Sequence, residues 1–186
     1  PTGISGTPFH SDVLLHKCNW KLIVENVLEA KHISSVHRNT FVKQGFISTN
    51  YSELEFNNDF SYAELKKVGK QRGYYRHFYM WPNLFVSDTD GMVTFVSTIF
   101  PVNEYETLKI WHIYPSEFLL RTPLATQQKV LQQSVDFTKT VLDEDKEILE
   151  EQQKTYGHYS QNHLDLPQEE RVQWFYDRVE KVSKKA

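Results

Sequence analysis

The sequence NWKLIVENVLEAKHISSVH, residues 19–37, brings two histidines together with an acidic residue. His32 and His37 are five residues apart, and Glu29 lies three residues before the first of them. Imidazole nitrogens and carboxylate oxygens are ligands that a divalent transition metal accepts, provided that a third ligand arrives from elsewhere in the chain. Whether this stretch is a metal site therefore depends on a residue outside it.

The apolar positions of the same stretch predict a helix that points His32 inward. Val24, Leu28 and His32 follow one another at i, i+4 and i+8, which is one face of a helix. Five residues advance a straight helix by about 500°, so the side chains of His32 and His37 would lie well over about 100° apart. We therefore expect the helix to break between them, at Ser34-Ser35, because serine side chains compete for backbone hydrogen bonds.

The remaining chain predicts one α+β domain. The sequence from Phe9 to Ile23 reads as a long strand, and the aromatic-rich part from Tyr74 to Tyr114 reads as an antiparallel meander with a hairpin turn at Asp90-Gly91. A long amphipathic helix follows, from Thr126 to about Thr155. The smaller expected elements are a short strand within Gly45–Thr49, a loop at Tyr156–Pro167, and a final helix from Gln168 to about Lys184. A short helix is also expected at Ser61–Val68, capped by Ser61 with Glu64 at the capping-box position.

This order of elements predicts a curved antiparallel sheet that grips a long C-terminal helix. Residues 1–8 read as a linker, and residues 9–186 as a single domain. Because the sequence begins without Met and in a linker, we expect it to be the downstream part of a longer protein.

Composition restricts the class of protein. Of the 186 residues, 39% are hydrophobic and 14% aromatic, which is enough for a real core and favours sheet. A net charge of -3 without a basic tract gives no sign of nucleic-acid binding. No apolar run approaches the roughly 18 residues of a membrane span, and no signal-peptide pattern is present, so we expect a cytoplasmic protein. The single cysteine, Cys18, excludes a cysteine-built cluster site and is typical of a reducing compartment.

A candidate third ligand lies on the long helix. Asp145 is three residues after Leu142 and four before Leu149, so it falls on the apolar stripe. A carboxylate that faces a core is costly unless it is paired or metal-bound. His32, His37 and Asp145 are therefore three inward candidates, on two helices that could face each other across a sheet. Two histidines and one carboxylate on one side of a metal leave the opposite positions open, as in non-haem Fe(II) oxygenases.

A structural role stays open for each of these residues at this point. An inward histidine is more often a hydrogen-bonded core residue than a ligand, and the inward position of Asp145 depends on the phase of the helix.

Several short motifs occur along the chain in a fixed order: Asn19-Trp20-Lys21-Leu22, Glu25-Asn26, Glu29-Ala30-Lys31-His32, His37, Trp81-Pro82-Asn83-Leu84-Phe85, Pro101-Val102 with Glu106-Thr107, Glu144-Asp145 with Glu150 and Gln153, and Leu166 to Val179. This series of motifs resembles that of the catalytic domain of the α subunit of Rieske non-haem iron ring-hydroxylating oxygenases. That family has a helix-grip (Bet v1/START-like) fold, which agrees with the α+β pattern. Two departures are Lys31, where the family usually has Tyr, and Glu29, where many members have Asp.

The resemblance implies that His32, His37 and Asp145 hold a mononuclear Fe(II), whose open positions take O2. Electrons would come from a Rieske [2Fe-2S] centre, commonly that of a neighbouring subunit in a ring, and the single Cys18 means that this chain cannot bind that cluster. Glu29 would be the electron-transfer bridge between His32 and a histidine of the cluster, because a carboxylate can hold the second nitrogen of a ligating histidine.

The implied partners follow from the same resemblance. They are O2, an aromatic or other small organic substrate that takes up one or two oxygen atoms, and a Rieske domain or a ferredoxin and reductase. The implied assembly is a homotrimer or a multiple of three, with no nucleic acid and no membrane. The residues expected in the substrate pocket are Asn26, Thr138, Val141 and Leu142, for which a plain core role is the alternative.

Three other functions are compatible with the sequence. A non-enzymatic helix-grip module would bind an apolar ligand without metal, and its three candidate ligands would not converge within about 5 Å. A fragment could fold but be inactive without its Rieske domain. A zinc hydrolase could use the same three ligands, although no obvious general base accompanies them.

Overall fold

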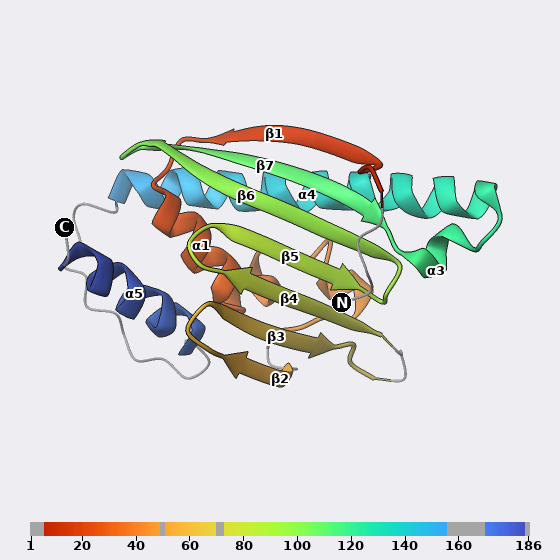
Figure 1. The fold of residues 1–186 in the computed structure, drawn as a ribbon, viewed down its shortest axis with the longest axis horizontal. Helices are drawn as coiled ribbons and strands as arrows, with labels where there is room; N and C mark the ends of the chain where they lie inside the picture. The colour runs from red at the N-terminus through yellow and green to blue at the C-terminus, as the bar shows by residue number, and fades with distance from the viewer. Residues whose placement is uncertain (1–5, 49–50, 70–72, 156–169, 185–186) are drawn as a thin grey trace.

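The computed structural model describes residues 6–48, 51–69, 73–155 and 170–184. Within these residues the strands form one seven-stranded antiparallel sheet, in the order β1-β7-β6-β5-β4-β3-β2 (Figure 1). The strands are β1 (His10–His16), β2 (Tyr51–Phe56), β3 (Phe60–Lys66), β4 (Tyr74–Met80), β5 (Leu84–Thr89), β6 (Val93–Asn103) and β7 (Glu106–Pro115).

The longest helix, α4, lies behind the sheet in Figure 1 and packs against β1 and β7. Helix α1 contacts both α4 and α5, so α1 and α4 meet directly on the same side of the sheet. The expectation that these two helices face each other across a sheet is therefore wrong, whereas the predicted α+β helix-grip architecture is confirmed. The helices are α1 (Trp20–Leu28), α2 (Lys31–Ser35), the 3-10 helix η1 (Val42–Gln44), α3 (Glu117–Leu120), α4 (Leu124–Thr155) and α5 (Glu170–Ser183).

The meander of β4 to β7 is formed as predicted. Each of these strands pairs antiparallel with the next one in the sequence. Asp90 and Gly91 are the central residues of the turn from β5 to β6, with φ angles of 55° and 68°. Positive φ at both central positions suits the right-handed twist of a hairpin, and Gly accepts it without steric cost.

The strand predicted from Phe9 to Ile23 is too long. Strand β1 ends at His16, and α1 begins at Trp20, before the predicted change near Val24. The reason is a helix cap: the Asn19 side chain accepts a hydrogen bond from the backbone N–H of Lys21 at 3.0 Å. A polar cap of this kind fixes a helix start in a stretch whose alternation alone reads as strand.

The helix predicted for Ser61–Val68 is a strand, β3, which lies between β2 and β4 in the sheet. Glu64 does not cap a helix, because its carboxylate accepts hydrogen bonds from the hydroxyl of Tyr62 at 3.2 Å and from Nε of Arg76 at 2.9 Å. Pairing with two neighbouring strands outweighs a weak local helix signal. The short strand expected within Gly45–Thr49 is also absent over residues 45–48, where the chain leaves η1 through Gly45 at a φ of 91°.

The two C-terminal helices agree with the periodicity. Helix α4 begins two residues before the predicted start, and α5 covers Glu170–Ser183 of the predicted final helix. The loop expected at Tyr156–Pro167 and most of the expected linker at residues 1–8 lie outside the described residues. None of the described helices is both long and apolar enough to cross a membrane.

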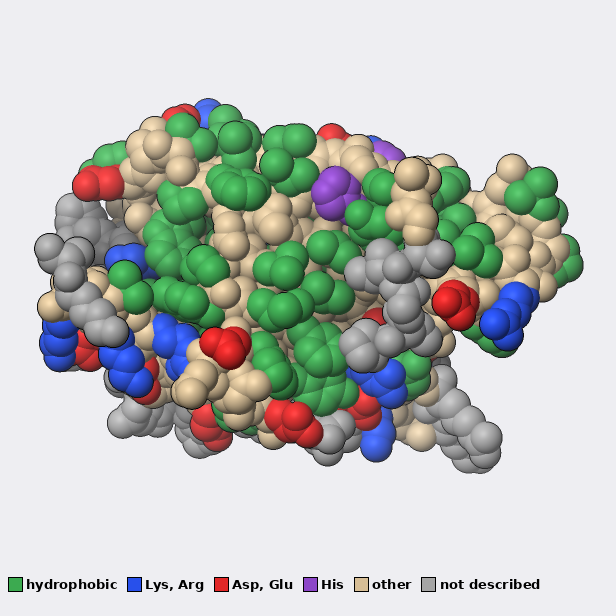
Figure 2. Space-filling view, in the orientation of Figure 1, with side chains coloured by type: hydrophobic (Ala, Val, Ile, Leu, Met, Phe, Trp, Pro, Cys, Tyr) green, Lys and Arg blue, Asp and Glu red, His purple; other side chains and the backbone are tan. Residues whose placement is uncertain are grey.

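Side chains on the inward face of the sheet build the core and the candidate site. On β7 this face carries Lys109, Trp111 and Ile113, all of which are buried. Figure 2 shows many hydrophobic side chains on the opposite, outward face, where Val13 and Phe100 are exposed.

Candidate metal centre

A break in the N-terminal helix places the two histidines. Helix α1 ends at Leu28, and Glu29 has extended backbone angles of φ -81° and ψ 143°. The short helix α2 then carries His32 and ends at Ser35, so that His37 follows on a separate segment. The expected break near Ser34-Ser35 is confirmed, whereas the earlier break at Glu29 was not expected. The two imidazole rings meet edge to face, with their centroids 5.0 Å apart.

Asp145 reaches the same place from the long helix. It is buried on α4 together with Leu142 and Leu149, with 8% of its surface exposed. The predicted helix phase of Asp145 is therefore confirmed. Helix α4 contacts α1, which directs this carboxylate toward the segment that follows α1.

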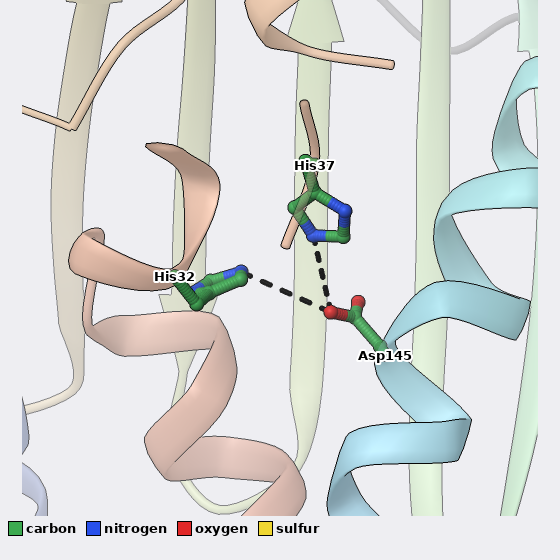
Figure 3. Close-up of side chains that lie close together, drawn as sticks. All are labelled: His32, His37 and Asp145. Carbon is green, nitrogen blue, oxygen red and sulfur yellow. Dashed lines mark ion pairs between the residues drawn. The ribbon is translucent and has the colours of Figure 1, made fainter. Parts of the chain in front are cut away.

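The three predicted ligands converge (Figure 3). One nitrogen from each histidine and one oxygen of Asp145 all lie within 4.8 Å of one another. Oδ1 of Asp145 is 3.1 Å from Nε2 of His37 and 3.9 Å from Nε2 of His32. Because bonds from a transition metal to nitrogen or oxygen are about 2.0–2.2 Å long, donors of one ion lie about 3–4.4 Å apart, and this set fits after small shifts. This convergence contradicts the expectation for a non-enzymatic module that binds an apolar ligand without metal, in which the three side chains would not lie within about 5 Å of one another.

A second set of carboxylates orients both histidines. Glu29 Oε1 is 2.5 Å from Nδ1 of His32, and Glu144 Oε2 is 2.7 Å from Nδ1 of His37. Thr40 donates its hydroxyl hydrogen to the same Glu144 oxygen at 2.8 Å. When Nδ1–H of a histidine donates to a carboxylate, Nε2 is the nitrogen that faces the metal position. A metal that replaces the Nε2 proton would therefore meet both rings in the orientation that a ligand needs.

Electrostatics around Asp145 favour its charged form. Burial alone would raise the pKa of Asp145, but its hydrogen bond to His37 and the positive charges of His32 and His37 lower that pKa overall. Burial alone would lower the pKa of His37, yet the hydrogen bonds and charges of Asp145 and Glu144 raise it overall. The amide of Asn26 also donates to Oδ1 of Asp145, at 3.0 Å. The site therefore holds a buried carboxylate that a cation can match.

A cavity of about 420 Å³ opens next to the three ligands. Its wall includes all four residues expected in the substrate pocket, Asn26, Thr138, Val141 and Leu142. That they contact a substrate stays a prediction. Phe41, Phe95 and Phe137 give much of the remaining wall an aromatic character.

Glu29 was expected to lie on a helix, but the backbone is extended at this residue. Its carboxylate also accepts hydrogen bonds from the backbone N–H groups of Lys31 and His32, at 2.6 and 3.2 Å, so it fixes the start of α2 as well as the His32 ring. Its side chain is 19% exposed.

Glu144 was missed as a site residue by the sequence reasoning, although its position next to Asp145 in the Glu-Asp motif is a usable signal. Thr40, which binds Glu144, has no comparable signal in the sequence.

The chain belongs to the family described as the ring hydroxylating alpha subunit (catalytic domain), whose family model matches residues 6–70 and 61–184. The family resemblance read from the sequence is therefore confirmed. A search of curated protein sequences finds no match.

Solved structures with a similar fold include a quaternary ammonium Rieske monooxygenase described in connection with carnitine oxidation by gut microbiota, with a TM-score of 0.73 and 19% identity over 93% of this chain. Dicamba monooxygenase bound to dicamba is similar with a TM-score of 0.73 and 14% identity over 94% of this chain. At sequence identities this low, the similarity shows a shared fold. The chain spans 49% of the first of these proteins and 58% of the second.

Proposed function

We propose that this chain is the catalytic domain of a Rieske-type oxygenase, in which His32, His37 and Asp145 hold a mononuclear Fe(II). The observation that carries the proposal is the convergence of these three side chains beside a cavity, in a chain of the ring-hydroxylating family. Iron at this position would supply the activation of O2 for mono- or dioxygenation of a small organic substrate.

The surrounding residues prepare the ligands for this task. Glu29 and Glu144 hold the Nδ1 atoms of the two histidines, which keeps both Nε2 atoms available. His37 is only 1% exposed, so water competes little for its nitrogen. Asn26 orients the carboxylate of Asp145 through its amide hydrogen bond.

Electrons have to come from outside the chain under this proposal. Cys18 is the only cysteine and is buried, so it cannot supply the two thiolates of a Rieske centre. Glu29 supports an electron route because its carboxylate touches His32 on one side and is partly exposed on the other. A Rieske domain, or a ferredoxin with its reductase, would dock near Glu29, and a homotrimer or a multiple of three would let a neighbouring subunit supply that domain.

Oxygen uptake tests this function. The chain would be loaded anaerobically with Fe(II), mixed with a reduced Rieske protein, and exposed to O2 in an oxygen electrode. We expect uptake that depends on both iron and the Rieske protein, and that is lost in His37→Ala but kept in the exposed control variant Asp143→Ala. Iron-bound chain that consumes no O2 above the iron-free chain would instead support a fragment that is inactive without its own Rieske domain.

A further inference from the structure

A buried lysine lines the same cavity as the candidate metal ligands. Lys109 lies on β7, opposite Ile99 of β6, and only 4% of its surface is exposed. Side chains alternate along a strand, so Lys109 points to the inward face that also carries Trp111. Lysine is almost never this buried unless its charge is paired, so the position of Lys109 in the cavity wall predicts an anionic partner.

Within the described part of the chain, the ammonium group of Lys109 has neither a hydrogen bond nor a close ion pair. Its neighbours include the rings of Phe85 and Phe95, whose centroids are 5.8 and 6.0 Å away, at the outer limit of a cation–π contact. Burial lowers the pKa of Lys109, and the charge of Asp145 only partly opposes this. Oδ1 of Asp145 already faces His37 and Asn26, so it is not a dedicated partner of the lysine.

A second polar group without a partner lies beside the lysine. Ser97 of β6 is 1% exposed and lines the cavity, and its hydroxyl has no hydrogen bond among the described residues. Ser97 pairs with Trp111 while Lys109 pairs with Ile99, so Ser97 and Lys109 are diagonal neighbours on the inward face, about 7–8 Å apart. An ammonium group and a hydroxyl at this spacing can bind the two oxygens of one carboxylate.

Arg171 adds another buried positive charge to the cavity wall. It comes from α5, is 3% exposed, and donates to Oγ of Ser61 at 3.1 Å and to Nδ1 of His77 at 2.9 Å. Burial and the charges of Arg171 and Lys109 keep the pKa of His77 well below its ordinary value, so His77 is neutral and the positive charge of this pair belongs to Arg171.

The acidic residues on the cavity wall are already engaged. Their partners are histidines at the candidate metal centre and a lysine near the β5–β6 turn. The pairs are Glu29 with His32 at 2.5 Å, Asp145 with His37 at 3.1 Å, and Asp90 with Lys67 at 2.7 Å. An added anion would therefore meet positive charge on the sheet side of the cavity without facing an unmatched carboxylate.

We propose that the substrate of this site is an organic acid, and that Lys109, assisted by Ser97, binds its carboxylate while the apolar part of the molecule lies against the aromatic wall. That this organic acid is a substrate rests on the proposed oxygenase function, whereas the binding of an organic anion in this cavity can be measured without turnover. A cationic ligand of the same shape is disfavoured by the two buried positive charges of Lys109 and Arg171.

Three ligands of nearly equal shape test the charge preference: benzoate, neutral benzamide and cationic benzamidinium. Each is titrated calorimetrically into the metal-free chain, where no metal can attract the carboxylate. We expect benzoate to bind roughly ten- to a hundredfold more tightly than benzamide, because a charge-assisted hydrogen bond contributes about 1.5–3 kcal/mol, and benzamidinium to bind most weakly.

Two cavity variants and one control connect the preference to these residues. Lys109→Met should bring benzoate binding down to the benzamide level and leave benzamide binding unchanged, and Ser97→Ala should weaken benzoate alone by roughly three- to tenfold. The control Lys129→Met removes an exposed lysine of α4 and should change neither. Equal binding of benzoate and benzamide by the wild-type chain, or a benzoate preference that survives in both folded cavity variants, would overturn the proposal.

Loading of the same protein preparations with Fe(II), followed by iron analysis, separates this inference from the proposed function. Wild-type chain that takes up Fe(II) but shows no benzoate preference would overturn the organic-acid proposal alone. Chain that prefers benzoate but takes up no Fe(II) would overturn the oxygenase proposal and leave the anion site standing.

Discussion

The contact between Glu144 and His37 gives a quantitative test of how the candidate metal centre is supported. Glu144 lies next to Asp145 on α4 and is 22% exposed, whereas His37 is 1% exposed. Its carboxylate oxygen is 2.7 Å from Nδ1 of His37 and 2.8 Å from Oγ1 of Thr40. The substitution Glu144→Gln keeps the shape and an oxygen acceptor for both contacts, and removes only the charge.

The expected effect is a weaker metal site that still forms. Loss of an outer partner of a metal-binding histidine costs about ten- to a hundredfold in metal affinity. Because glutamine retains the hydrogen bond and loses only its charge assistance, we expect Glu144→Gln at the lower end, at about tenfold, or about 1.4 kcal/mol. Glu144→Ala, which removes the acceptor as well, should approach about a hundredfold.

Competition between the chain and a chromophoric chelator for Fe(II) under anaerobic conditions measures these affinities. Glu147→Gln is the matched control, since it makes the same change on the same helix at an exposed position. An affinity of Glu144→Gln and of Glu144→Ala within about twofold of wild type, in folded protein, would show that the Glu144–His37 contact does not support a metal ligand.

Three further perturbations address the electron route, the pH dependence and the core. Glu29→Gln should keep its iron at saturating Fe(II) but slow turnover with a Rieske partner, and unchanged turnover would refute the bridging role. Burial, and after it the charges of Lys109 and Lys146, lower the pKa of His16 from 6.5 to about 3. Between these two pH values His16 is therefore protonated in the unfolded chain and neutral in the folded chain. Protonation of His16 in the unfolded chain should therefore lower the free energy of unfolding, measured with urea, by about 2–3 kcal/mol between about pH 7 and about pH 4.5. His16→Leu should remove this part of the pH dependence. Equal pH dependence of unfolding in the wild type and in His16→Leu would contradict the prediction. Phe175→Ala removes a fully buried ring whose centroid is 5.5 Å from the ring centroid of Trp20, and should destabilise the fold by about 3–5 kcal/mol. A loss under about 1 kcal/mol would show that the core around Phe175 collapses into the space or is packed more loosely than described.

Local periodicity made part of the site predictable. Asp145 could be placed inward because the spacing of Leu142 and Leu149 defines the buried stripe of a long helix without further information. The break between His32 and His37 was likewise required by helix geometry, since two side chains five residues apart on a straight helix point in different directions.

Interactions between distant parts of the chain account for most of the errors, and a local helix cap accounts for one. Ser61 and Glu64 form a short capping pattern, but the strand pairing on both sides of β3 is not visible from that segment alone. The early start of α1 came from a single cap at Asn19 in a stretch with strand-like alternation. Lys109 carries no local signal, because a lysine in an alternating strand ordinarily points to solvent. Its burial follows from the helices that cover the inward face.

If His32, His37 and Asp145 together hold iron, the folded chain binds iron only while all three side chains are present. The wild-type chain, Asp145→Ala and the exposed control Asp143→Ala would be loaded with Fe(II) without oxygen, desalted, and measured by elemental analysis, with circular dichroism to confirm folding. We expect stoichiometric iron in the wild type and in Asp143→Ala, and almost none in Asp145→Ala. Full iron in folded Asp145→Ala would contradict it.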